Sequence, residues 1–145
     1  MRLRSLIAAT FLGVSTSLTV PSATAAAAVV AVPHCAGYSV FERDFDGQTS
    51  HTSVPTVHHQ NFDIDCVLAP GDRGAGVAAL QATLNRCYAP IAIDGMFGQK
   101  MARLVRDLQV LLGIPVDGIY GPHMARAMNW AWYDASGTSQ RCDRL

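Results

Sequence analysis

A stretch of thirteen residues occurs twice in this chain, 23 positions apart. Residues 91–103 read IAIDGMFGQKMAR and residues 114–126 read IPVDGIYGPHMAR. Both copies contain Asp-Gly, an aromatic residue followed by Gly, and a closing Met-Ala-Arg. A repeat with a fixed period indicates one supersecondary unit that is built twice. Any fold for this chain must therefore accommodate two copies of the same local structure.

Each copy predicts a tight turn, a buried aromatic residue and the start of a helix. Gly supplies positive φ and Asp accepts hydrogen bonds from nearby amides, so Asp94 and Asp117 are expected to cap turns rather than act as an acid–base pair. Phe97 and Tyr120 are expected to enter the core, and the hydroxyl of Tyr120 leaves a second role in ligand contact open. Pro122 suits the first position of a helix.

Helices are expected over residues 75–86, 99–112 and 122–132. Their apolar residues recur three and four positions apart, which is typical of one buried helix face. Gly113 is expected to end the second helix, and Pro115 prevents its continuation. Gln81 and Gln109 each follow a core leucine. A half-buried amide needs partners, so we expect each to bind the backbone of a neighbouring loop.

These motifs resemble the peptidoglycan-binding domain-like family. The resemblance covers about residues 68–132 and runs from the Gly-rich residues 71–76 through Leu80-Gln81 to the two Asp-Gly turns. The family's Thr after each Gly-Pro is Met101 and Met124 here. The resemblance implies a mainly α fold, a compact three-helix bundle. To this we add a small N-terminal β-hairpin stapled by a disulfide.

The chain ends and the cysteines indicate a secreted protein. Residues 1–28 have the basic start, apolar run and small residues of a signal peptide, with cleavage near 25–28. The sequence then divides into an appendage over 29–66 with a hairpin around Asp46-Gly47, the domain over 67–132, and a tail over 133–145. No span is expected in the mature chain.

Four cysteines in a small secreted chain predict two disulfides. Spacing alone allows three pairings. We favour Cys35–Cys66 with Cys87–Cys142, and the nearest competitor is Cys66–Cys87 with Cys35–Cys142. No C-x-x-C pair and no histidine metal motif occurs, so we expect neither a metal nor a cofactor.

Charge excludes one class of partner. Eleven Lys and Arg balance eleven Asp and Glu, without a basic patch. Nucleic acid is therefore not an expected partner. The resemblance implies binding of peptidoglycan or another glycan or peptide of the cell wall, and a secreted wall enzyme as a companion. Ligand contacts are expected at the turn ends and at two arginines in equivalent repeat positions: Asp94, Arg103, Asp117, Tyr120 and Arg126.

Three functions follow from these observations. The first is a secreted, wall-associated, non-catalytic peptidoglycan-binding protein. The second is a disulfide-stabilised protein-interaction or inhibitor protein that uses the fold as a scaffold. The third is a small wall hydrolase, which the absence of nucleophile and metal motifs disfavours.

Overall fold

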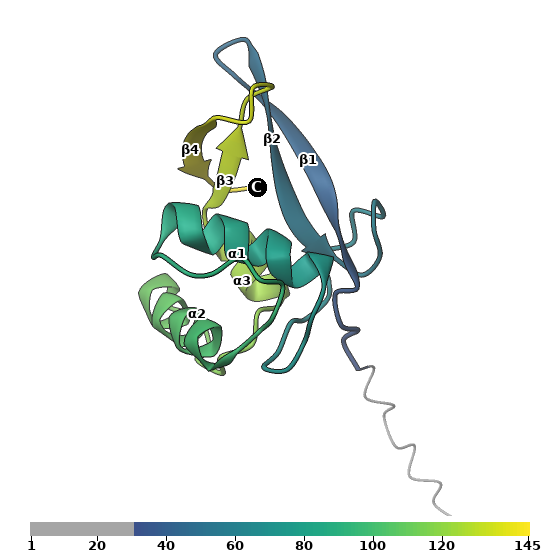
Figure 1. The fold of residues 1–145 in the computed structure, drawn as a ribbon, viewed down its shortest axis with the longest axis vertical. Helices are drawn as coiled ribbons and strands as arrows, with labels where there is room; N and C mark the ends of the chain where they lie inside the picture. The colour runs from purple at the N-terminus through teal and green to yellow at the C-terminus, as the bar shows by residue number, and fades with distance from the viewer. Residues whose placement is uncertain (1–30) are drawn as a thin grey trace, which may run out of the picture. The chain divides into compact units, whose positions relative to one another are not determined.

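A computed structural model describes residues 31–145 of the chain. These residues form one compact unit. The signal peptide predicted over residues 1–28 lies outside the described residues. Figure 1 shows the arrangement of the elements within the compact unit.

The first regular element of the unit is a long β-hairpin. Strands β1 (Gly37–Phe45) and β2 (Gln48–Thr56) pair antiparallel along their whole length. Asp46 and Gly47 connect them with φ of 54° and 82°. Two positive φ values in a two-residue loop fit the twist of the flanking strands, which is why Asp-Gly is favoured there. The polar residues 48–51 belong to β2, so the paired strands reach up to the two-residue turn.

Two further strands extend this hairpin into one sheet. β3 (Trp130–Tyr133) and β4 (Ser139–Asp143) pair antiparallel, and the strand order is β1-β2-β3-β4. β2 and β3 meet only at His51 and Tyr133. Pro55 lies in β2, which is an interior strand of this sheet. It is tolerated because at its position β2 pairs with β1 alone.

The helices occupy the middle of the chain. They are α1 (Ala75–Cys87), α2 (Gln99–Leu112) and α3 (Pro122–Ala127). α1 packs against β1, β2 and β3, while α2 contacts α3. Gly113 ends α2 with φ of 67°, as its position predicted.

The prediction of a mainly α three-helix bundle is wrong. The described residues contain a four-stranded antiparallel sheet, and only two of their helices exceed seven residues. The third helix ends at Ala127 instead of residue 132, and the predicted tail supplies β4. The run Trp-Ala-Trp-Tyr is rich in β-formers and precedes turn residues, which is a hairpin signal that the continued helix pattern obscured.

Two tryptophans hold the added strands to the rest of the unit. Trp130 and Trp132 are 0% and 1% exposed. The Nε1 of Trp130 donates to the carbonyl of Ala125, and that of Trp132 donates to the carbonyl of Asp143. Buried indole N–H groups need such acceptors. Each tryptophan therefore joins β3 to a neighbouring element.

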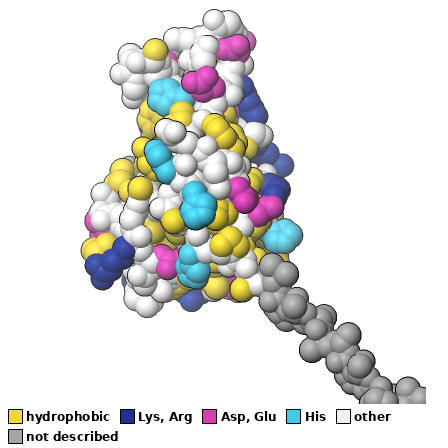
Figure 2. Space-filling view, turned by 90° about the vertical axis from the view of Figure 1, so that its right-hand side faces the viewer, with side chains coloured by type: hydrophobic (Ala, Val, Ile, Leu, Met, Phe, Trp, Pro, Cys, Tyr) yellow, Lys and Arg dark blue, Asp and Glu magenta, His cyan; other side chains and the backbone are white. Residues whose placement is uncertain are grey.

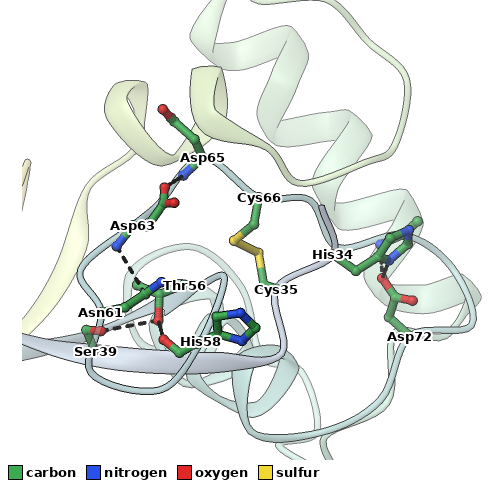
Figure 3. Close-up of a disulfide and its surroundings, with 11 residues drawn as sticks. His34, Cys35, Ser39, Thr56, His58, Asn61, Asp63, Asp65, Cys66 and Asp72 are labelled. Carbon is green, nitrogen blue, oxygen red and sulfur yellow. Dashed lines mark hydrogen bonds and ion pairs between the residues drawn. A yellow bond between two sulfur atoms is a disulfide. The ribbon is translucent and has the colours of Figure 1, made fainter. Parts of the chain in front are cut away.

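Both disulfides have the pairing that we favoured. Cys35 bonds Cys66, and Cys87 bonds Cys142. Figure 3 shows the first, which joins the residues before β1 to those after the loop that follows β2. At the end of β2 the Thr56 hydroxyl donates to the carbonyl of His58 and accepts a hydrogen bond from the Ser39 hydroxyl. The second disulfide joins the end of α1 to β4.

The repeated Asp-Gly turns are held by glutamines of the preceding helices. Gln81 Nε2 donates to Asp94 Oδ1 at 2.8 Å and its Oε1 accepts from the Gly95 amide at 2.8 Å. Gln109 does the same with Asp117 Oδ1 at 2.7 Å and the Gly118 amide at 2.9 Å. Each Nε2 also donates to the carbonyl two residues after its aspartate. These bonds confirm the loop-binding role predicted for both glutamines.

Replacing Cys87 and Cys142 by serine should lower the free energy of unfolding by about 4 kcal/mol. The crosslink spans 55 residues, and closing a loop of that length limits the entropy of the unfolded chain. Cys142 is exposed and Cys87 is half-buried, so the serine hydroxyls themselves cost little. Urea denaturation followed by tryptophan fluorescence measures the change. A loss below 1 kcal/mol would contradict the crosslink's role.

Gln109→Glu should destabilise the protein by about 2–3 kcal/mol at pH 7, because a donor becomes a charged acceptor facing Asp117 Oδ1 and a carbonyl. The folded state would raise the pKa of the introduced carboxyl, so the folded chain binds its proton more readily. The loss of unfolding free energy should therefore become smaller as the pH falls through that raised pKa. Denaturation at pH 7 and pH 5 tests this. Gln99→Glu, at an exposed position, is the control. Equal losses of stability in both variants would refute the role of Gln109 in holding the turn.

Candidate functional site

The repeat builds two small hollows on the surface of the unit. The first has a volume of about 140 Å³ and lies beside the first Asp-Gly turn and the start of α2. The second has a volume of about 180 Å³ and lies beside the second turn and the start of α3. The first is lined by Gln81, Ile91, Ala92, Asp94, Met96, Gly98, Lys100 and Met101. The second is lined by Val67, Gln109, Ile114, Pro115, Asp117, Ile119, Gly121, Pro122, His123 and Met124.

The two linings correspond position by position. Every lining residue of the first hollow from 91 to 101 has a counterpart 23 positions later in the second. The glutamines correspond as well, at a spacing of 28 positions. The duplicated sequence therefore produces duplicated surface shape as well as a duplicated turn.

Methionines form the buried floor of each hollow. Met101 and Met124 are each 1% exposed and pack in the core. They stand where the family resemblance has Thr. A thioether is apolar and polarisable and lacks the hydroxyl of Thr, so these floors favour aliphatic groups.

A carboxylate stands in the wall of each hollow. Asp94 and Asp117 are exposed, and their Oδ1 atoms accept bonds from the clamping glutamine and from the amide two residues on. Among residues 31–145, neither Oδ2 has a hydrogen-bond partner. The Gln81 side chain, and then the Met96 amide, lower the pKa of Asp94 below its usual value. Each turn therefore fixes a charged group and leaves one oxygen for a ligand.

The other three predicted contacts lie elsewhere. Arg103 is exposed on α2 and Arg126 pairs with Asp65, and neither lines a hollow. Tyr120 is 0% exposed and packs edge-on against Trp130. Burial raises the pKa of the Tyr120 phenol. Its side chain belongs to the core and does not reach the surface.

Lys100 and His123 are lining residues that the sequence reasoning missed. They occupy one of the two variable positions of the repeat, directly before the methionines. Both are exposed and line corresponding hollows. The signal was available, because a variable position between fixed ones in a repeat is where two copies can differ in specificity.

Histidine side chains are spread along one face of the molecule, as Figure 2 shows. His34 bonds Asp72 at 2.7 Å, His59 packs on Tyr38, and His51 packs on Tyr133. Within residues 31–145 no group of three or more His, Cys, Asp and Glu side chains is placed to hold a metal ion. In the same residues no helix has the length and apolar character needed to cross a membrane.

Comparison with known proteins gives the following matches. Residues 73–128 match the family model described as "Putative peptidoglycan binding domain". The chain is similar to the crystal structure of the SleB N-terminal domain, with 34% identity over 41% of this chain and 84% of that one, at a TM-score of 0.37. It is also similar to a peptidoglycan-binding protein from Clostridioides difficile, in complex with glutamine hydroxamate, with 26% identity over 60% of this chain and a TM-score of 0.44. The chain spans about half of that structure, 53% of its length.

No curated protein matches the chain. The matched residues 73–128 include both clamping glutamines and both hollow-forming repeats, and they lie within the range of the resemblance seen in the sequence. Residues 73–128 of this chain therefore belong to the peptidoglycan binding domain family.

Proposed function

We propose that this protein is a secreted, non-catalytic cell-wall protein that binds peptidoglycan. The observation that carries the proposal is the family match over residues 73–128, which contain both repeats. The remaining described residues complete the sheet against which α1 packs. On this view they support the binding domain.

The geometry of the hollows supports a binding role. The side chains that hold each turn are fixed by several hydrogen bonds, so each carboxylate is oriented before a ligand arrives. A pre-oriented site loses less entropy on binding. The volumes of about 140 and 180 Å³ suit small groups of a larger ligand. A polymer such as peptidoglycan would present such groups repeatedly.

Two features support secretion. The N-terminal residues have the pattern of a signal peptide. The four cysteines of the described residues are all in disulfides, which persist in oxidising compartments.

The state of Asp94 supports the non-catalytic part of the proposal. A general base works best when its pKa lies near the operating pH. Hydrogen bonds instead hold the pKa of Asp94 below its usual value. Asp94 thus suits electrostatic recognition better than proton transfer.

The purified mature protein should sediment with insoluble peptidoglycan sacculi and leave them intact. Centrifugation with sacculi measures binding, and chromatography of the supernatant detects soluble fragments. The same protein, unfolded by reduction and alkylation, is the control for nonspecific trapping in the pellet. Release of muropeptides would refute the non-catalytic proposal. Failure to sediment would favour the protein-interaction hypothesis.

Binding should change only slightly between 50 and 300 mM salt. Residues 31–145 carry nine Lys and Arg against eleven Asp and Glu, because Arg2 and Arg4 precede residue 31. A net charge of −2 gives no bulk attraction to an anionic wall, so short-range contacts must dominate, and these are screened little. The same sedimentation assay at both salt concentrations checks this. A tenfold loss of affinity at high salt would contradict it.

A further inference from the structure

Two opposite charges line the first hollow without pairing. Asp94 and Lys100 both border it, yet within the described residues Lys100 forms no ion pair or hydrogen bond. Other exposed charges of the unit do pair, such as Arg126 with Asp65 and Arg141 with Asp46. The hollow therefore separates an anion from a cation and leaves both available.

Apart from Gln81, the rest of this lining is apolar. Ile91 and Met101 are 7% and 1% exposed and belong to the core. A ligand that matches the hollow needs a cationic group for Asp94, an anionic group for Lys100 and an aliphatic part for the floor. An α-amino acid group with a free ammonium, a free carboxylate and an aliphatic chain has these three parts in a volume that fits about 140 Å³.

Two other cations near the turns do not belong to the hollow. Arg73 is close enough to contribute to the lowered pKa of Asp94, and it lines a neighbouring hollow that Asp94 also borders, but it does not line the hollow of Lys100. Arg103 lies one turn after Lys100 in α2 and does not line the hollow. Lys100 is thus the cation that shares the hollow with Asp94.

The second hollow has the same carboxylate and floor but a different partner group. His123 replaces Lys100, and Pro115 replaces Ala92. An imidazole is not a fixed cation near neutral pH, whereas an ammonium is. The second hollow therefore still attracts a cation through Asp117. It lacks a permanently charged side chain that would bind a carboxylate.

From this comparison we infer that the two hollows are unequal amino-acid subsites. The Asp94–Lys100 hollow binds a zwitterionic α-amino acid end, and the Asp117–His123 hollow binds an aliphatic amine whether its carboxyl is free or amidated. This inference rests on the proposed function, since free and amidated ends of peptide stems would be the groups bound in the wall. It adds which chemical group each repeat recognises.

Nuclear magnetic resonance titration can read the two hollows separately. The amides of Gly95 and Gly118 lie in the two turns and report on one hollow each. The probes are norleucine, norleucine amide and N-acetylnorleucine. At the first hollow norleucine should bind about tenfold more tightly than its amide, the scale of one lost charged contact. At the second the two affinities should agree within about threefold. N-acetylnorleucine should bind neither hollow, because it lacks the ammonium.

Exchanging the two variable residues should exchange the preferences. Lys100→His should bring the tenfold ratio at the first hollow to about one. His123→Lys should raise the ratio at the second hollow to about ten. Both positions are exposed, so the variants should fold, and the unchanged dispersion of the spectra would verify this. Arg103→Gln removes an exposed cation outside both hollows and should change neither ratio.

Sedimentation with sacculi distinguishes failure of this inference from failure of the proposed function. If the wild-type protein sediments but norleucine shifts neither reporter, the amino-acid subsites are refuted and wall binding stands. Ratios that do not move in the exchange variants would also refute the subsites. If the reporters respond as expected but no protein sediments, the hollow chemistry is supported and its assignment to the wall is overturned.

Discussion

The buried glutamine that clamps each Asp-Gly turn is the interaction on which the rest of this structure depends. Gln81 and Gln109 are 1% and 3% exposed, and each amide bonds both a carboxylate and backbone groups of its turn. Once the turn is fixed, the aromatic residue two positions after its glycine can enter the core and the next helix can begin. The same bonds orient the carboxylates at the surface. One side chain therefore links the core to the candidate site.

The sheet supplies the other half of the core. Val54 of β2 and Trp130 of β3 are both 0% exposed, and α1 packs against both strands. A hairpin alone is marginally stable in water, so β1 and β2 gain stability from this helix and from the Cys35–Cys66 bond. β4 is short and lies at the sheet edge, where Cys142 ties it to α1.

Sequence reasoning succeeded where a local chemical rule decided the structure. The turns, the first two helices and the Asp46-Gly47 hairpin followed from such rules, whereas the disulfide pairing was favoured among three that the spacing allowed. It failed at residues 128–133, where Met128 and Ala131 extended a helical pattern that tertiary packing of Trp130 and Trp132 overrode. In the site, the aspartates could be predicted from the turns. Lys100 was missed although it stands at a variable position of the repeat, because its place in a hollow depends on how the start of α2 faces the turn.

Duplication separates two tasks within the site. Residues identical in both copies, such as the Asp-Gly pair and the methionine, fix the turn and the floor of the hollow. Residues that differ, such as Lys100 and His123, lie at the rim, where substitution leaves the clamp intact. Exposed positions of this kind change stability little, so they are free to change in chemistry. A duplicated turn can thereby present two different surfaces on one scaffold, and a ligand with two distinct groups gains affinity when both are engaged at once.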